Sequence, residues 1–570
     1  MTEKKGFGKS VFNSKIALYM TIGIIGLIAV SLFFVTNDKP TEDPSTSISN
    51  QVEESKRIAI ERFQEQFCGI DSKPNSNGYV TEILLPGRCE MPLGVVVDAE
   101  ESKVWYISTK DGLLGSIDLK NQKFDDERAI PLWTSRQNPI ESSQVWTMKI
   151  DSNDNIWFTD EKQNSLWKYD KSADEFESYK VPAESESFGS TYPVSLDFDS
   201  NGNVYFVGIR SPSLWFGNIT QMSNNTSRGI SEIPLPLQGF NAIDRDLIST
   251  GSIVADNKDK SIWITMLAFG QKGQILRYDT NNQTFTTFDL PSRLRSPVGI
   301  TLADSRDLWV TDHGTSIFYN FVPDGRNITE FVTSKASERI FGGRESLSAQ
   351  AYTLPYWIHK SEDGSLWFNE HTGNKIARFL PDNNTLIEYW IPSQNKLFSP
   401  CDSQTTEVCG IANALQLDVG DRAAGDADNE ASSAERTRAS EVWFTEWSEN
   451  KIGRVNTSRA LPFSVHTSPQ DITIRKGESA SVDVFVTPSP SVLIDRVNMT
   501  ASATFVPTGD FGNSTGSFSQ ESILLNNGKT QTVKFVINPS ADLPTGRYML
   551  MLGAQDSSVT YLRALPVNII

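Results

Sequence analysis

The chain has 570 residues, and its 70 acidic residues outnumber its 52 basic residues, which gives a formal net charge of −18. Single hydrophobic cores stop growing near ~250 to 300 residues, so we expect at least two folded units. The acidic balance argues against a nucleic-acid partner, because phosphate binding requires clustered Lys and Arg.

The first predicted element is a membrane anchor. Residues 1–15 are polar and contain four lysines, and residues 16–35 then run without a charge. At ~1.5 Å per residue this run spans about 30 Å, the thickness of one hydrocarbon core. A cleavable signal peptide has a shorter apolar region. We therefore expect an uncleaved single-pass anchor, with residues 1–15 as a cytoplasmic tail and the remainder outside the cell membrane.

Two further features suit an extracellular chain. The four cysteines all follow the anchor and form two close pairs, so of the three possible connectivities we expect the disulfides Cys68–Cys89 and Cys401–Cys409. Asn-x-Ser/Thr sequons are typical of a glycoprotein. They occur at Asn218, Asn224, Asn225, Asn282, Asn327, Asn383, Asn456, Asn498 and Asn513.

Residues 36–77 are expected to form a polar linker that includes a short helix over Gln51–Phe67, where apolar residues recur on one face. An aromatic-centred strand then recurs seven times. The copies are VWYIST from 104, IWFTDE from 156, VYFVG from 204, IWITM from 262, LWVTDH from 308, LWFNEH from 366 and VWFTEW from 442. A short strand precedes each copy and two more follow most copies, which predicts four antiparallel strands per unit. Residues 78–460 therefore predict a seven-bladed β-propeller, whose blades bury one another's faces.

Residues 461–570 alternate apolar and polar side chains between turn signals, which predicts an immunoglobulin-like β-sandwich. The predicted fold class is thus all-β, with one transmembrane helix, then a propeller, then a sandwich. A polar run, 421–441, is expected between the first two strands of blade seven.

Candidate chemistry follows from propeller geometry. The ends of the second strands, the starts of the first strands and the loops between blades meet at one mouth of the axis. This brings His313 and His371 together as candidate catalytic bases, beside Asp312, Glu370 and Glu446 as candidate ligands of Mg²⁺ or Ca²⁺.

A structural role is the alternative for the carboxylates, because each recurs within the repeated motif. Glu370 can pair with Lys375, and Glu446 with Lys451. The two histidines do not recur in every blade, so they are the stronger functional candidates.

The loops at the mouth supply candidate binding residues. Arg339 and Arg344 lie in the long connection between blades five and six, Tyr356 begins the first strand of blade six, and Trp447 follows the second strand of blade seven. Long loops over a rigid scaffold are where binding usually takes place.

The motif carried by VWFTEWSENKIGRV, LWFNEHTGNKIARF and LIEYWIP resembles that of the virginiamycin B lyase (streptogramin lyase) family over about residues 78–458. The resemblance implies a seven-bladed propeller that opens a cyclic depsipeptide lactone by Mg²⁺-dependent elimination. It also implies catalytic histidines within Pro-His-Ala/Gly-Ile at the starts of inner strands. The matching places here are Pro297-Val298-Gly299-Ile300, Pro355-Tyr356-Trp357-Ile358 and Gly410-Ile411-Ala412-Asn413, none with a histidine. The resemblance therefore carries the fold and not the enzyme.

The leading hypothesis is a membrane-anchored surface protein that binds a ligand or a cell-envelope partner and no nucleic acid. A metal-dependent lyase or lactonase acting on a cyclic ester is one alternative, and a structural cell-envelope protein is another.

Overall fold

The computed structural model describes residues 54–55, 57–59, 61–62, 65–69, 73–137, 143–182, 191–209, 211–240, 248–268, 272–337, 340, 352–398, 409–421, 440–506, 515–526 and 528–570. The chain forms two compact units, residues 1–61 and 62–570. In the first unit residues 54–55, 57–59 and 61 are helical, and Arg57 pairs with Glu54 at 2.6 Å and Glu61 at 3.0 Å. The predicted anchor, 16–35, lies outside the described residues. No helix within the described ranges is long and apolar enough to cross a membrane.

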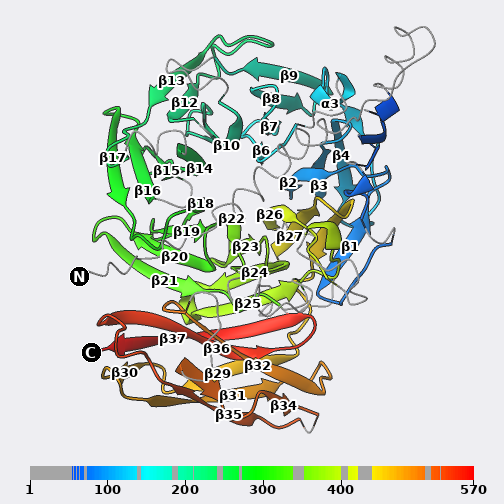
Figure 1. Cartoon of the computed structure of the whole chain (residues 1–570). Helices are drawn as coiled ribbons and strands as arrows, with labels where there is room; N and C mark the ends of the chain where they lie inside the picture. The colour runs from blue at the N-terminus through cyan, green and yellow to red at the C-terminus, as the bar shows by residue number, and fades with distance from the viewer. Residues whose placement is uncertain are drawn as a thin grey trace, which may run out of the picture. The chain divides into compact units, whose positions relative to one another are not determined.

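Seven antiparallel blades of four strands each surround a common axis, so the predicted propeller is confirmed (Figure 1). Blade one is β2 (Pro92–Asp98), β3 (Lys103–Ser108), β4 (Leu113–Asp118) and β5 (Arg128–Ala129), and the short helix α3 (Thr134–Gln137) follows it. Blade two is β6 (Met148–Ile150), β7 (Ile156–Asp160), β8 (Ser165–Asp170) and β9 (Glu175–Lys180). Blade three is β10 (Pro193–Phe198), β11 (Val204–Gly208), β12 (Ser213–Gly217) and β13 (Ile230–Pro234). Blade four is β14 (Ile248–Asp256), β15 (Ser261–Ala268), β16 (Lys272–Asp279) and β17 (Thr284–Asp289).

The remaining blades carry the candidate site. Blade five is β18 (Pro297–Leu302), β19 (Leu308–Asp312), β20 (Ile317–Val322) and β21 (Asn327–Val332). Blade six is β22 (Pro355–Lys360), β23 (Leu366–Glu370), β24 (Lys375–Leu380) and β25 (Thr385–Trp390), with the 3-10 turns η3 (Pro381–Asn383) and η4 (Lys396–Phe398) after its last two strands. Blade seven is β26 (Ala414–Asp421), β27 (Ser440–Glu446), β28 (Lys451–Val455) and, from the start of the propeller, β1 (Val80–Leu84).

The β1 strand closes the ring, which the sequence interpretation did not foresee. Val80 lies opposite Val455, and the ladder continues to Leu84 opposite Lys451. The chain leaves blade seven after β28, so β1 covers an edge that would otherwise expose unpaired backbone groups. The polar insert lies between β26 and β27 as predicted, and residues 422–439 of it are outside the described ranges.

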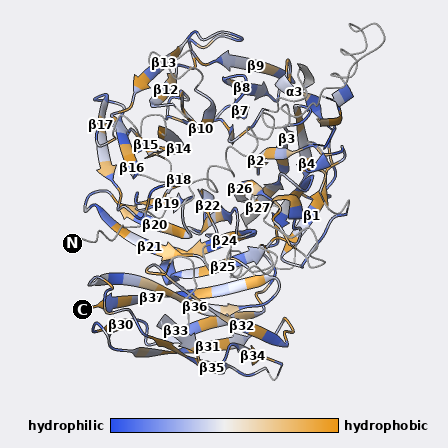
Figure 2. Cartoon of the chain, in the orientation of Figure 1, coloured by the Kyte–Doolittle hydropathy of each residue, from blue (hydrophilic) through white to orange (hydrophobic). Residues whose placement is uncertain are grey.

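The repeated motif explains the packing between blades. Its Trp is buried in most blades, as Trp157 and Trp367 show at 0% exposure. The Thr of the repeated motif forms a hydrogen bond between blades. The hydroxyl of Thr265 donates to the Val298 carbonyl in the next blade at 2.8 Å. Thr445 donates in the same way to Leu93 at 3.0 Å. These bonds hold the second strand of one blade against the first strand of the next. Hydrophobic residues run along the blades between polar turns (Figure 2).

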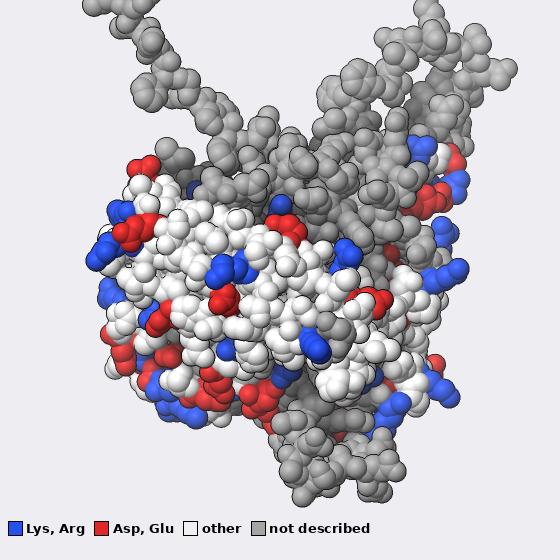
Figure 3. All heavy atoms as spheres, turned by 90° about the horizontal axis from the view of Figure 1, so that it is seen from below, with Lys and Arg blue, Asp and Glu red and all other residues white. Residues whose placement is uncertain are grey.

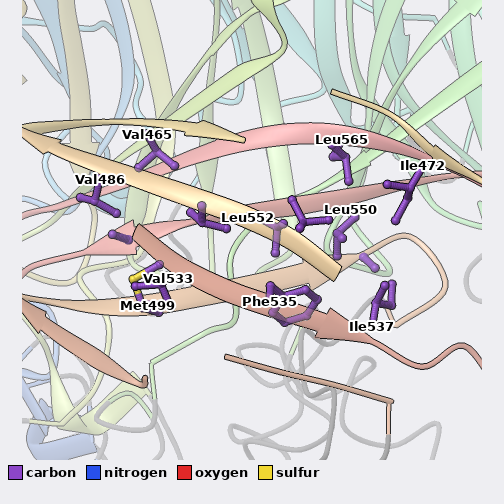
Figure 4. Packing of buried hydrophobic residues seen from close by; sticks show 14 of the residues in the cluster. Val465, Ile472, Val486, Met499, Val533, Phe535, Ile537, Leu550, Leu552 and Leu565 are labelled. Atoms are coloured by element: carbon purple, nitrogen blue, oxygen red, sulfur yellow. The ribbon is translucent and has the colours of Figure 1, made fainter. Parts of the chain in front are cut away.

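Residues after the propeller form two further sheets. One contains β29 (Phe463–Ser468), β31 (Ala480–Pro488), β35 (Gln531–Ile537) and β33 (Gly516–Phe518), and the other contains β37 (Val559–Ile569), β36 (Gly546–Gln555), β32 (Arg496–Ala503) and β34 (Ser522–Leu524), with β30 (Ile472–Ile474) parallel to β37. Their shared core includes Val486, Phe535 and Leu552 (Figure 4). The immunoglobulin-like topology within this two-sheet unit stays a prediction.

The two-sheet unit is built onto blade six. The β37 strand pairs with β25, from Thr385 opposite Arg563 to Tyr389 opposite Val559, so one sheet runs through both (Figure 1). In β36 successive side chains face different cores: Leu550 joins the core between the two sheets, and Met551 joins a core with Trp309 and Phe368. Both faces of β36 are therefore buried.

The Cys68–Cys89 disulfide is confirmed. Cys409 is disulfide-bonded as well, but Cys401 lies outside the described residues, so that pairing stays a prediction. On the surface that Figure 3 shows, basic and acidic side chains are interspersed.

Candidate functional site

The candidate site lies at the end of the axis where the first strands begin. His313 follows β19, and its backbone N–H donates to the Ser296 carbonyl at 2.8 Å. His371 follows β23 and donates in the same way to Leu354 at 3.1 Å. Each histidine is thereby held against the start of its blade's first strand. This end also receives Tyr356 from β22.

The two imidazoles contact each other directly. His313 Nε2 lies 3.2 Å from His371 Nδ1, and the ring planes differ by 8°. His371 Nε2 lies 3.1 Å from Oδ1 of Asn413, which precedes β26. Blades five, six and seven thus each contribute one member of a hydrogen-bonded row.

The Asn413 amide oxygen determines which atoms donate and which accept along this row. An amide oxygen only accepts hydrogen bonds, so His371 carries its proton on Nε2 and presents a lone pair on Nδ1. His313 then donates from Nε2 to that lone pair. His313 Nδ1 is left as the acceptor at the end of the row.

Aromatic side chains surround this row. The Tyr356 ring lies 4.3 Å from the His313 ring, and Trp146 of blade two meets Tyr356 edge to face at 6.2 Å. The Trp146 indole N–H donates to Glu161 at 2.8 Å. Since blades two and six lie on opposite sides of the ring, the Trp146–Tyr356 contact crosses the axis (Figure 1). We call Trp146, Glu161, His313, Tyr356, His371 and Asn413 the axial cluster.

The imidazoles of the axial cluster are neutral at neutral pH. Burial, together with the neighbouring His371, lowers the pKa of His313 to about 3. Burial lowers the pKa of His371 to about 4, against the hydrogen bond to Asn413. A charged imidazole is disfavoured here because the protein replaces most of its water. Both histidines nonetheless remain only half-buried, as does Tyr356.

Asp312 does not face the axial cluster as a free ligand. It is fully buried and accepts from the backbone N–H of Ser296 at 2.9 Å and of Gly314 at 3.0 Å. Thr315 donates to it at 3.1 Å. Burial raises the pKa of Asp312 to about 6. Its role in the structure is to hold the turn that carries His313.

Glu370 points into blade six. Lys375 lies 3.0 Å from Glu370 and 3.0 Å from Glu388, and all three side chains are fully buried. Ser334 donates its backbone N–H to Glu388 at 2.7 Å. Burial and the nearby Glu388 carboxylate raise the pKa of Glu370. The predicted pairing with Lys375 is confirmed, so Glu370 stabilises a buried charge.

Glu446 occupies the equivalent place in blade seven. Lys451 forms its ion pair with Glu82 of β1 at 2.9 Å, where pairing with Glu446 was expected. Burial and the Glu82 carboxylate raise the pKa of Glu446. Glu82 of β1 takes the place in blade seven that Glu388 of β25 has in blade six. Glu446 is therefore enclosed within the blade.

These positions do not fit the Mg²⁺ that the resemblance implies. Asp312 holds a turn, Glu370 belongs to a buried ion-pair network, and Glu446 is fully buried within a third blade. Across the described residues, no group of three or more His, Cys, Asp or Glu side chains could hold a metal ion.

The remaining predicted site residues divide in two. Trp447 is 3% exposed, because Phe67 covers it at 4.5 Å and Phe398 packs beside both rings. Arg339 and Arg344 lie outside the described residues. The structure adds Trp146 and Asn413, which sequence reasoning had not selected as site residues. Only their position in the sequence could have identified them, because each lies next to the start of a blade's first strand or the end of its second strand.

No family model matches the chain. A curated relative, "Protein cueball" of Drosophila virilis, is 26% identical over 167 residues, which are 27% of this chain. The chain matches 24% of that protein's length.

Among solved structures, virginiamycin B lyase from Staphylococcus aureus is 20% identical with a TM-score of 0.46, and the match covers 66% of this chain and 98% of that one. A streptogramin B lyase structure is 21% identical with a TM-score of 0.47, covering 66% and 97%. A catalytically inactive virginiamycin B lyase from S. aureus, solved with quinupristin, is 20% identical with a TM-score of 0.44, covering 66% and 98%. Activity does not follow from these likenesses.

Proposed function

We propose that the chain is a cell-surface ligand-binding protein whose propeller binds its ligand at the axial cluster. The observation that carries the proposal is the 3.2 Å contact between His313 and His371 beside the half-buried Tyr356 ring. Ligand sites in proteins typically combine aromatic surface with a few placed polar groups. The axial cluster has this composition, and three blades hold its polar row in place.

The chemistry of the row indicates what the ligand offers. His313 Nδ1 is an acceptor, and both imidazoles are neutral because burial lowers their pKa values to about 3 and about 4. A ligand bound here therefore presents an O–H or N–H donor to His313. It places an apolar or aromatic face against Tyr356, which lies next to His313.

Binding is favoured over the lyase or lactonase alternative for two reasons. A general base works best with a pKa near the operating pH, and the pKa values of His313 and His371 lie well below neutrality. Of the carboxylates that would hold a metal, Glu370 is held in a buried ion-pair network and Asp312 in a turn instead.

The structural alternative is supported by one contact. Phe67 is itself fully buried and packs on Trp447, so the segment 65–69 covers part of the mouth at blade seven. Among the described residues, none covers the half-buried histidines on blades five and six in this way, which is why we place the ligand there.

Display outside the membrane is part of the proposal. Six of the sequons have exposed asparagines, which suits a glycoprotein; these are Asn224, Asn225, Asn282, Asn327, Asn383 and Asn498. We expect the full chain to remain in alkali-washed membranes and a variant lacking 16–35 to be released. Release of the full chain would contradict the anchor.

The chain has only four histidines, so labelling them with ¹⁵N gives a simple probe of the site. We would titrate the full chain in detergent with quinupristin and with a set of small aromatic alcohols and amides. Binding is expected to shift the His313 and His371 signals and to leave exposed His466 unchanged. His371→Gln should abolish the response and His466→Gln should preserve it. If no compound moves His313 or His371 more than His466, the proposal fails.

A further inference from the structure

Glu161 gives the axial cluster a negative charge. Its carboxylate accepts the Trp146 indole N–H at 2.8 Å, and a neutral donor of this kind leaves the charge of the carboxylate in place. The charge also reaches the Tyr356 phenol, because burial together with Glu161 raises the pKa of Tyr356. His313 and His371 are neutral at neutral pH. The axial cluster therefore carries a net negative charge.

The basic side chains around the axial cluster act elsewhere. Burial raises the pKa of Asp312 against the attraction of Arg295, which places Arg295 near the turn under His313. Among the described residues, no lysine or arginine shifts the pKa of His313 or of Tyr356. Lys162, the residue after Glu161, is exposed, so water and salt screen its charge. A group bound over Tyr356 therefore lies in the field of an anion.

The Tyr356 ring offers a cation a second attraction. The face of an aromatic ring carries partial negative charge, and a cation within ~6 Å of the ring centre is attracted to it. Tyr356 is half-buried, and its ring lies 4.3 Å from His313 and edge to face with Trp146 at 6.2 Å. These contacts hold the ring in place, so little side-chain freedom is lost when a ligand binds. Burial also removes part of the water that would weaken the attraction.

We infer that the ligand of the axial cluster is an organic ammonium ion, which rests on the function proposed above. Its ammonium group lies beside Glu161, its carbon skeleton packs on Tyr356, and a second donor reaches the acceptor nitrogen of His313. A neutral ligand of the same shape keeps the last two contacts and loses the first. An anion of the same shape is repelled by Glu161.

Three small phenols with a two-carbon side chain separate charge from shape. Tyramine carries an ammonium group, tyrosol carries a hydroxyl group in its place, and 4-hydroxyphenylacetate carries a carboxylate. Each is titrated into the full chain in detergent, with ¹⁵N-labelled histidines and with exposed His466 as the internal reference. We expect tyramine to bind about tenfold more tightly than tyrosol, because it adds a partly desolvated cation beside a carboxylate and an aromatic ring. The carboxylate compound should bind most weakly.

Two variants assign the preference to Glu161. Glu161→Gln keeps an acceptor for the Trp146 N–H and removes the charge. It should lower the affinity for tyramine about tenfold, to that for tyrosol, and leave the affinity for tyrosol unchanged. The matched control is Glu175→Gln, which removes an exposed carboxylate from β9, the outermost strand of the same blade, and should change neither affinity.

The outcomes separate this inference from the proposed function. Equal affinities of the parent for tyramine and tyrosol would overturn the inference and leave the proposed site in place. Tight tyramine binding by Glu161→Gln, equal to that of the parent, would do the same. If none of the three phenols moves the His313 and His371 signals, the inference fails, and the titrations with quinupristin and the neutral alcohols and amides decide the proposed function separately.

Discussion

His313 and His371 lie with their rings within 8° of parallel and with Nε2 and Nδ1 3.2 Å apart, although they belong to different blades. Neither the repeat nor a shared loop requires this contact. It arises because the second strands of blades five and six end at the same level of the axis.

The histidine contact makes stability depend on pH. The folded pKa values, about 3 and about 4, lie below the ~6.5 of an unfolded histidine. The unfolded chain therefore binds more protons, so the free energy of unfolding falls as pH drops from ~6.5 towards ~4. After allowance for the exposed part of the rings, we expect a loss of about 1 to 3 kcal/mol. Urea unfolding at each pH measures it.

The control for the pH dependence is the double variant His313→Gln/His371→Gln. The raised pKa of Asp312 acts in the opposite direction, since a group with a raised pKa stabilises the fold at lower pH. It is present in both proteins and cancels in their difference. An identical pH profile for parent and double variant would contradict the neutral-pair assignment.

Removing Lys375 should destabilise the propeller strongly. Lys375→Met leaves Glu370 and Glu388 buried without their cation, and breaking a buried pair typically costs about 3 to 5 kcal/mol. The matched control is Lys534→Met, whose partner is Asp483 and whose side chain is 54% exposed. That change should cost at most ~1 kcal/mol. Equal urea midpoints for the two variants would rule out the buried network as a source of stability.

The disulfide should stabilise the closed ring. Cys68 and Cys89 are 21 positions apart, and loop-closure entropy for a link of this length is worth about 3 kcal/mol. Cys68→Ser/Cys89→Ser should lower the thermal midpoint and make residues 62–69 sensitive to trypsin. Reduction of the parent should reproduce the double variant. If the variant resists trypsin as the oxidised parent does, Phe67 alone holds this segment on Trp447.

The two-sheet unit and the propeller should unfold together. Met551→Asp places a charge in the core that β36 shares with blades five and six, where Met551 is 0% exposed. We expect a loss above ~3 kcal/mol and the appearance of two calorimetric transitions. Leu493→Asp changes a fully exposed leucine and should do neither. Two separate transitions already present in the parent would show that the two parts are not coupled.

Much of this fold could be predicted from local sequence, because each blade must bury its two faces against its neighbours and does so with the same repeated motif. LWFNEH and VWFTEW place Trp367 and Trp443 between blades, and both are fully buried as expected. The pairing of Glu370 with Lys375 also follows from one blade alone.

The missed features all depend on segments that are distant in sequence. Glu82 reaches Lys451 only because β1 crosses to blade seven, and Phe67 covers Trp447 by the same route. The strands β25 and β37 pair with each other, but the sequence of each is that of an ordinary edge strand and does not indicate its partner. Asn413 could be selected only after the ends of three blades had been placed together.

The closure of blade seven by β1 sets an order of events for a chain that emerges from the ribosome amino end first. Val80 is synthesised long before its partner Val455. The β1 strand therefore has no strand to pair with while the other blades form. During that interval β28 is also a free edge once it emerges, and both are templates for wrong pairing. A ribosome that stalls before blade seven thus releases six finished blades and one orphan strand. We expect such fragments to depend on chaperones far more than the finished protein does.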